Sequence, residues 1–337
     1  ALVASGVPRA EAERRARLEV GGSDQIKEAH RDARGTRVFE DALRDARVAV
    51  RMLRRTSLFT TTAIVTLALG VGVNTLVFSV VRSLVLKPLP ITQPDRVWQV
   101  QRGGDLAHSF PLYRAFRDTS ATFDGLGAYR ITMMQVDTPV GPTHSWGYLA
   151  TGSYFDLLRV APVRGRLFTA ADDRVPGASP FVVLSYDFWQ SAFGGRDDVV
   201  GTTVRVNRLP FTVVGVAPRD FRGTEVFYRP DLWVPMMMQA EIEVGHPWLD
   251  SASTENTWVL GRLASGVAPA QAEAELDGIA RQHARTAGVS ESSDAIRLTR
   301  PGLVGDAIGG PARVFGLSVL ALAGLVLLVA CANLAAT

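Results

Sequence analysis

Two long stretches without a charged residue interrupt an otherwise polar chain. The first, residues 57–81, reads SLFTTTAIVTLALGVGVNTLVFSVV, and the second, residues 314–337, reads VFGLSVLALAGLVLLVACANLAAT. A helix needs roughly 20 mainly apolar residues, at about 1.5 Å of rise each, to cross the hydrocarbon core of a bilayer. The pattern therefore predicts two transmembrane helices. A buried helix of a soluble core is the alternative for either stretch, and the presence of two disfavours it.

Small and polar residues lie within the first hydrophobic stretch. Gly70, Gly72 and Asn74 would be unfavourable against lipid, but such residues are common where two membrane helices pack closely. We predict that these three residues form a helix-packing face.

Arginines precede the first hydrophobic stretch and indicate its orientation. Arg47, Arg51, Arg54 and Arg55 lie just before it, whereas few basic residues follow it. Because basic residues accumulate on the cytoplasmic side, the N-terminus is predicted to be cytoplasmic and residues 82–313 extracytoplasmic. The second stretch would return the chain to the cytoplasm, and the first would serve as an uncleaved anchor.

Residues 1–56 are predicted to form a short helical cytoplasmic leader, with helices at 8–20 and 23–33 and a third that begins after Thr36. In the third helix, apolar residues recur at spacings of four and three, which places them on one face. A basic amphipathic helix next to a membrane span is predicted to lie on the lipid surface. Packing against a neighbouring subunit is the alternative. The apolar residues are Phe39, Leu43, Ala46, Val50 and Leu53.

Residues 82–313 alternate short apolar runs with turn residues, which predicts one large mixed domain. We expect a loop at 241–257, and we expect Phe123, Leu126 and Tyr129 to pack against a helix at 109–119. Strands and helices that are mixed without regular alternation indicate the α+β class. The other predicted elements are strands at 96–101, 143–150, 181–185, 231–235 and 257–263, a hairpin at 202–216, and helices at 186–193 and 269–286.

Charge and cysteine content are informative only by region. The formal net charge is +3, but residues 1–57 alone carry 13 Lys and Arg against 9 Asp and Glu, so the basic excess belongs to the leader. We therefore expect contact with membrane lipids and not with nucleic acid. Cys331 is the only cysteine, so the outer domain has no disulfide and must be stabilised by its own core.

No recognisable catalytic, metal or cofactor motif occurs in the sequence. The chain lacks the phosphate-loop and nucleophile-elbow motifs, and its five histidines have no zinc-site spacing. The acidic pairs Asp172-Asp173 and Asp197-Asp198 lie in predicted turns, where acids commonly cap backbone groups. Core packing is expected for Met236 to Met238. We predict a protein that is not an enzyme and has no cofactor; a membrane-anchored hydrolase would need a constellation that is not evident.

The block MLRRTSLFTTTAIVTLALGVGVNTLVFSVVRSLVLKPLP resembles the first membrane helix, and its exit, of the FtsX/MacB-like ABC transporter permeases. Further blocks follow in the order of that family. TGSYFDLLRVAPVRGRLFTAADD, VVLSYDFWQSAFGG, VVGTTVRVNRLPFTVVGVAPRDFRGTE and DLWVP resemble its periplasmic core domain. VLLVACANLA looks like the start of the second membrane helix. The leader resembles that of the acidobacterial duplicated orphan permeases.

The resemblance implies a multi-pass protein of the bacterial inner membrane that couples membrane-helix motion to an extracytoplasmic domain. It implies a separate ABC ATPase subunit and a dimer, or pseudo-dimer, of permease halves. The chain begins with Ala and ends in a hydrophobic stretch, so we expect it to be part of a longer protein. The alternative function is a membrane-anchored sensor or scaffold whose periplasmic domain binds a partner protein without an ATPase.

Overall fold

The computed structural model describes residues 37–55, 57–81, 90–290, 293–302 and 305–335. The chain divides into two compact units, which we describe separately. One comprises Ala1–Thr75 with Leu322–Thr337, and the other comprises Leu76–Ala321. The helices predicted at 8–20 and 23–33 lie outside the described residues.

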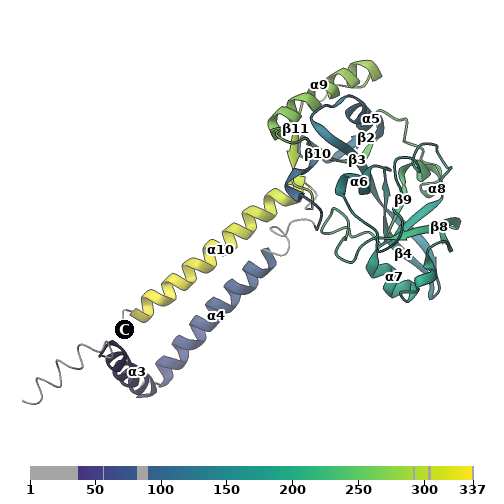
Figure 1. Ribbon diagram of the computed structural model, residues 1–337. Helices are drawn as coiled ribbons and strands as arrows, with labels where there is room; N and C mark the ends of the chain where they lie inside the picture. The colour runs from purple at the N-terminus through teal and green to yellow at the C-terminus, as the bar shows by residue number, and fades with distance from the viewer. Residues whose placement is uncertain (1–36, 56, 82–89, 291–292, 303–304, 336–337) are drawn as a thin grey trace, which may run out of the picture. The chain divides into compact units, whose positions relative to one another are not determined.

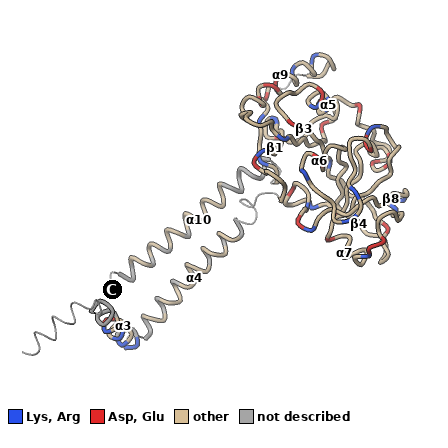
Figure 2. The backbone as a smooth tube through the Cα atoms, viewed as in Figure 1, with Lys and Arg blue, Asp and Glu red and all other residues tan. Residues whose placement is uncertain are grey.

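The first unit contains α3 (Arg37–Arg55), most of α4 (Ser57–Val81) and the end of α10 (Gly305–Ala335). The described residues of α4 carry no charge, in contrast to the basic residues of α3 (Figure 2). Taking only the described residues, none of the helices combines the length and the apolar character that crossing a membrane requires. The two predicted transmembrane helices are therefore not confirmed.

The second unit is built on a mixed sheet. Among the described residues it has eleven strands, in the order β11-β1-β10-β3-β4-β9-β6-β8-β5; β2 pairs with β10, and β7 pairs with β3 and β8. Most pairs are antiparallel, but β4–β9 and β6–β8 are parallel. The strands are β1 (Val97–Arg102), β2 (Ala107–Ser109), β3 (Phe123–Thr138), β4 (Gly141–Ala150), β5 (Arg164–Gly165), β6 (Phe181–Leu184), β7 (Thr203–Val206), β8 (Leu209–Val216), β9 (Leu232–Pro235), β10 (Glu255–Leu263) and β11 (Ile296–Thr299).

Helices cover this sheet. Figure 1 shows α5 and α9 near β10 and β11, and α7 near the end of the sheet that contains β4 and β8. Serine caps start two of these helices, because the Ser109 Oγ accepts a hydrogen bond from the Leu112 N–H and the Ser185 Oγ accepts one from the Phe188 N–H. The helices are α5 (Phe110–Thr119), α6 (Tyr154–Leu158), α7 (Tyr186–Phe193), α8 (Gln239–Ile242) and α9 (Pro269–Ala287), with 3-10 turns η2 (Pro94–Arg96), η3 (Asp197–Val199) and η4 (Met236–Met238).

The mixed α/β class and most predicted elements of the outer domain are confirmed. The predicted hairpin is β7–β8, and its turn is Asn207-Arg208, where both residues have positive φ as a two-residue hairpin turn requires. Phe123 and Leu126 pack in the same cluster as Tyr113 and Phe116 of α5, as predicted, whereas Tyr129 lies in the second cluster. The sequence did not predict that residues 123–129 also begin β3, which pairs with β4, β7 and β10. β10 also begins at Glu255, inside the predicted loop.

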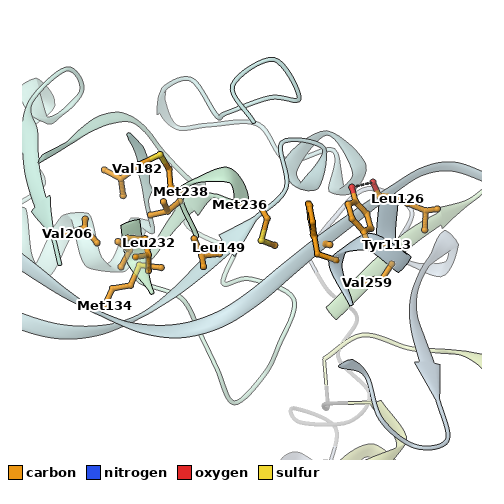
Figure 3. Close-up of a cluster of buried hydrophobic side chains, with 14 of the residues drawn as sticks. Tyr113, Leu126, Met134, Leu149, Val182, Val206, Leu232, Met236, Met238 and Val259 are labelled. Atoms are coloured by element: carbon orange, nitrogen blue, oxygen red, sulfur yellow. Dashed lines mark hydrogen bonds between the residues drawn. The ribbon is translucent and has the colours of Figure 1, made fainter. Parts of the chain in front are cut away.

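The core runs along β3. Figure 3 shows Tyr113, Leu126 and Val259 at one end of a buried cluster and Met134, Val206 and Leu232 at the other. Met236 and Met238 are buried in the same cluster, which confirms their predicted core role. A second cluster, rich in aromatic side chains, lies around Tyr129, Tyr148, Tyr154 and Trp233.

Candidate functional site

The segment Thr92–Arg96, which leads into β1, is attached to the sheet through a buried arginine. Arg262 on β10 is 2% exposed, and its Nε donates to the Leu157 carbonyl at 2.8 Å. Its Nη2 donates to the Thr92 carbonyl at 2.8 Å and its Nη1 to the Gln93 carbonyl at 3.3 Å. One guanidinium thus joins this segment, β10 and the end of α6.

Three further arginines hold the same segment. Arg300 donates to the Asp95 carbonyl at 2.7 Å, and its guanidinium lies 3.8 Å from the ring centroid of Trp98. Arg159 donates to the Gln93 side chain at 3.3 Å. Arg96 donates through its Nε to the Leu263 carbonyl at 3.0 Å and forms an ion pair with Asp124. We call Arg96, Arg159, Arg262 and Arg300 the base clamp.

The charges and acceptors around the base clamp fit a structural role, which is to attach the segment Thr92–Arg96 to the sheet. Burial, together with Arg159 and Arg96, lowers the pKa of Arg262, and the Asp124 carboxylate opposes this effect. Backbone carbonyls accept most of the hydrogen bonds. The forked guanidinium suits this arrangement, since it presents several donors in a fixed geometry and a lysine presents a single ammonium. Sequence analysis missed this site because its acceptors are backbone atoms.

A buried polar network ties a long loop to the aromatic cluster. The Tyr129 hydroxyl donates to Glu225 Oε1 at 2.6 Å, and Gln99 Nε2 donates to the same oxygen at 3.2 Å. Glu225 is 2% exposed. Burial, with the nearby Glu225 carboxylate, raises the pKa of Tyr129 well above its usual value, so the phenol stays protonated and donates. These hydrogen bonds therefore connect β1, β3 and the loop before β9 in a single network.

The predicted helix-packing residues lie on α4. Gly70 and Asn74 are half-buried and Gly72 is exposed. No heavy atom among the described residues would lie within 4 Å of a Cβ added at Gly72. Their packing role remains a prediction, and the described part of the chain provides no partner for Gly72.

The predicted topology residues Arg47, Arg51, Arg54 and Arg55 all lie exposed on α3. Leu43 and Val50, from the apolar face of the same helix, are also exposed, at 54% and 48%. The predicted membrane contact of this helix is not tested by the structure.

The histidine and aspartate side chains that were considered for an active site make structural contacts in the fold. His108 is buried and its Nε2 lies 3.1 Å from the Val100 carbonyl; burial lowers its pKa to about 4. Asp172 caps the Thr169 N–H and pairs with Arg166, while Asp197 and Asp198 pair with Arg164 and Arg196. Within the described residues, no group of three His, Cys, Asp or Glu side chains could hold a metal ion.

Asp173 bridges the ends of two parallel strands. Its carboxylate accepts the Gly152 N–H, after β4, at 2.9 Å and the Met237 N–H, after β9, at 2.8 Å. Burial raises the pKa of Asp173 from 3.8 to about 6, although these two hydrogen bonds oppose the rise. The carboxyl therefore takes up a proton more readily in the folded than in the unfolded chain.

We expect the stability that Asp173 contributes through this proton to be fully present below pH 3.8 and lost as the pH rises through about 6. Asp173→Asn carries no titrating group at this position. As the pH rises from 4 to 7, the unfolding free energy of the wild-type protein should therefore fall relative to that of Asp173→Asn. Parallel pH profiles from urea unfolding would contradict the assignment.

Comparison with known families extends over most of the chain. Residues 60–279 match the family described as the MacB-like periplasmic core domain. The matched range begins inside α4 and ends inside α9, so it includes the base clamp residues Arg96, Arg159 and Arg262.

Curated relatives match a shorter segment. Over 128 residues the chain is 27% identical to the macrolide export ATP-binding/permease protein MacB of Shigella dysenteriae serotype 1 and of Escherichia coli K12. The match covers 37% of this chain and 18% of the length of each relative.

Two solved structures are similar to part of this chain at low identity. A domain of a putative permease from Porphyromonas gingivalis has a TM-score of 0.47 and 16% identity, covering 62% of this chain and 92% of that one. The periplasmic region of MacB from Actinobacillus actinomycetemcomitans has a TM-score of 0.46 and 15% identity, covering 62% of this chain and 90% of that one.

Proposed function

Because the chain belongs to the family with a MacB-like periplasmic core domain, we propose that it is part of the permease subunit of an ABC-type system in which membrane-helix motion moves an extracytoplasmic domain. The observation that carries this proposal is the family match over residues 60–279. We propose a separate ATPase subunit, as the resemblance to the FtsX/MacB-like permeases implies. The permease would work as a dimer, or pseudo-dimer, of two halves in the bacterial inner membrane.

The proposal requires residues 57–81 and 314–337 to cross the membrane. Both stretches lack charged residues, and 25 residues of helix extend about 37 Å at 1.5 Å per residue, more than the roughly 30 Å of hydrocarbon. The arginines of α3 favour a cytoplasmic N-terminus. Residues 82–313 would then be periplasmic.

Coupling would pass through the base clamp. Any displacement of the chain after α4 reaches the domain through Thr92–Arg96, which is held by hydrogen bonds to β10, to the end of α6 and to Arg300. The buried Glu225 network and the continuous core would make the domain move as one body. A side-chain clamp of this kind transmits a displacement without any catalytic group.

Orientation can be tested by cysteine labelling of the complete protein in a background where Cys331 and any cysteine outside residues 1–337 are replaced by serine. Asp198→Cys, exposed in the outer domain, should react with a membrane-impermeant maleimide on intact spheroplasts. Asp45→Cys, exposed on α3, should react only after permeabilisation and serves as the matched control. Labelling of Asp45→Cys on intact cells, or protection of Asp198→Cys, would contradict the proposed topology.

Gly70, Gly72 and Asn74 are proposed to pack against another permease helix outside this chain. Gly72→Leu inserts a large side chain at such a contact, and overpacking of about 1–3 kcal/mol would lower the assembled fraction roughly tenfold. Val71→Leu, at a neighbouring exposed position, is the control. Equal yields of assembled complex on native gels for the two variants would argue against the packing role.

A further inference from the structure

A cleft with a cationic rim opens between α5 and the loop that carries Asp173. Its volume is about 470 Å³, within the range typical of small-molecule sites. Arg114 and Arg117 contribute from successive turns of α5, and Arg174 contributes from the opposite loop. Nothing in the base clamp or the proposed transport mechanism uses this cleft.

The floor of the cleft is ordered and partly polar. Tyr113 is 1% exposed, and its hydroxyl lies 3.4 Å from the Leu126 carbonyl, a contact drawn in Figure 3, and 3.5 Å from the Ser153 Oγ. The Thr151 hydroxyl lies 3.2 Å from the same Ser153 oxygen. Met237 and the edge of Phe110 add an apolar wall. These side chains are fixed by the core, so the floor is preformed.

Two of the rim arginines lie over aromatic rings of the cleft, Arg114 over Phe110 at 5.6 Å and Arg117 over Tyr113 at 5.8 Å, and their ion pairs are exposed. Arg114 pairs with Asp250, whose side chain is 91% exposed, and Arg117 pairs with the adjacent Asp118, which is 59% exposed. Exposed ion pairs of this kind contribute about 0–1 kcal/mol each. A ligand that offers a better acceptor can therefore displace them at little cost.

The groups that line the cleft favour an anionic ligand. Three arginines and one acid, Asp173, line it, and both oxygens of that carboxylate already accept backbone N–H groups. Asp118 and Asp250, which pair with two of the arginines, lie outside the lining and would be displaced by the ligand. Guanidinium groups bind carboxylate and phosphate oxygens through paired hydrogen bonds. The volume exceeds what an inorganic ion would fill, and the wall beside Met237 can receive an apolar group.

We propose that this cleft binds a small organic anion, with a carboxylate or phosphate head held by Arg114, Arg117 and Arg174 and an apolar portion against Met237 and Phe110. The site would give the extracytoplasmic domain a ligand-sensing or cargo-binding function of its own. This function is independent of the proposed ATPase coupling.

The test is calorimetric titration of the intact chain, held in lipid nanodiscs, with phenyl phosphate and with phenylacetate. The uncharged 2-phenylethanol has a similar apolar body and lacks the anionic head. We expect saturable binding of at least one anion, weakened by added salt, and no comparable binding of the alcohol. The relative affinity of the two anions distinguishes a phosphate ligand from a carboxylate ligand.

Variants locate the site. Arg114→Gln with Arg117→Gln should weaken anion binding about tenfold or more, because charged hydrogen bonds are lost. Arg164→Gln with Arg196→Gln is the matched control, since both arginines are exposed and paired with aspartates in the same domain. Absence of saturable binding by both anions, or an equal loss in the two double variants, would overturn the proposal. Retained tryptophan fluorescence would exclude unfolding as the cause.

Discussion

Arg262→Ala should destabilise the outer domain by about 3–5 kcal/mol, because it removes a buried guanidinium and leaves the buried Leu157 carbonyl and the partly buried Thr92 and Gln93 carbonyls without their donor. Arg262→Lys should lose less, since it keeps the charge but cannot reach all three acceptors at once. Arg205→Ala, an exposed arginine on β7, should change stability by less than about 0.5 kcal/mol.

Urea unfolding followed by tryptophan fluorescence measures this effect directly. All six tryptophans lie between residues 98 and 258, so the signal reports on the outer domain alone. If Arg262→Ala and Arg205→Ala unfold at the same urea concentration, the base clamp does not hold the segment Thr92–Arg96. Hydrogen exchange at residues 92–96 should also accelerate in Arg262→Ala.

Trp233→Ala should lower the unfolding free energy of the outer domain by about 3–5 kcal/mol, because it leaves a cavity at the centre of the aromatic cluster. Trp233 is fully buried, stacked on Phe221 at 5.5 Å between ring centroids and edge-on to Phe155 at 5.6 Å. The loop that contains Glu225 follows Phe221, so the same change should loosen the network between this loop and β1.

Trp146→Ala is the matched control, because it removes one tryptophan from the signal but from a side chain that is 40% exposed. We expect Trp146→Ala to lower the unfolding free energy by about 1 kcal/mol. Equal unfolding midpoints for Trp233→Ala and Trp146→Ala would show that the aromatic cluster does not stabilise the domain.

Local patterns were sufficient to predict several elements from the sequence. The α7 helix was predicted from its aromatic run and from Gly194-Gly195 after it, and in the structure Gly194 ends the helix in a left-handed conformation with φ of 65°. The α9 helix was predicted from its apolar spacing and from Pro269 at its first position. In both, neighbouring residues alone determine the boundaries.

β3 was missed because its stability comes from the tertiary contacts of the strand. Asp124, Gly125 and Gly127 are disfavoured in strands, although α6 approaches Gly127 closely: an added Cβ would lie 3.3 Å from Leu157 Cδ2 and 3.4 Å from Tyr154 Cα. Pairing with β4, β7 and β10 outweighs this local preference.

The base clamp could not be predicted for a related reason. Most of its hydrogen bonds join residues more than 100 positions apart, such as Arg262 with Leu157 and Thr92, and most acceptors are backbone carbonyls, which every residue carries. The cationic cleft likewise combines α5 with a loop far along the chain. A sequence pattern cannot show which distant loop an arginine will meet.

If this chain belongs to an ATP-driven permease, the complete protein should co-purify with an ABC ATPase subunit. Extraction from the native membrane in mild detergent, mass spectrometry of co-purifying subunits and an ATP hydrolysis assay on the same sample would test this. We expect an ABC ATPase subunit and vanadate-sensitive hydrolysis. An intact membrane assembly with neither would rule out an ATP-driven permease and would favour a membrane-anchored scaffold that works without an ATPase.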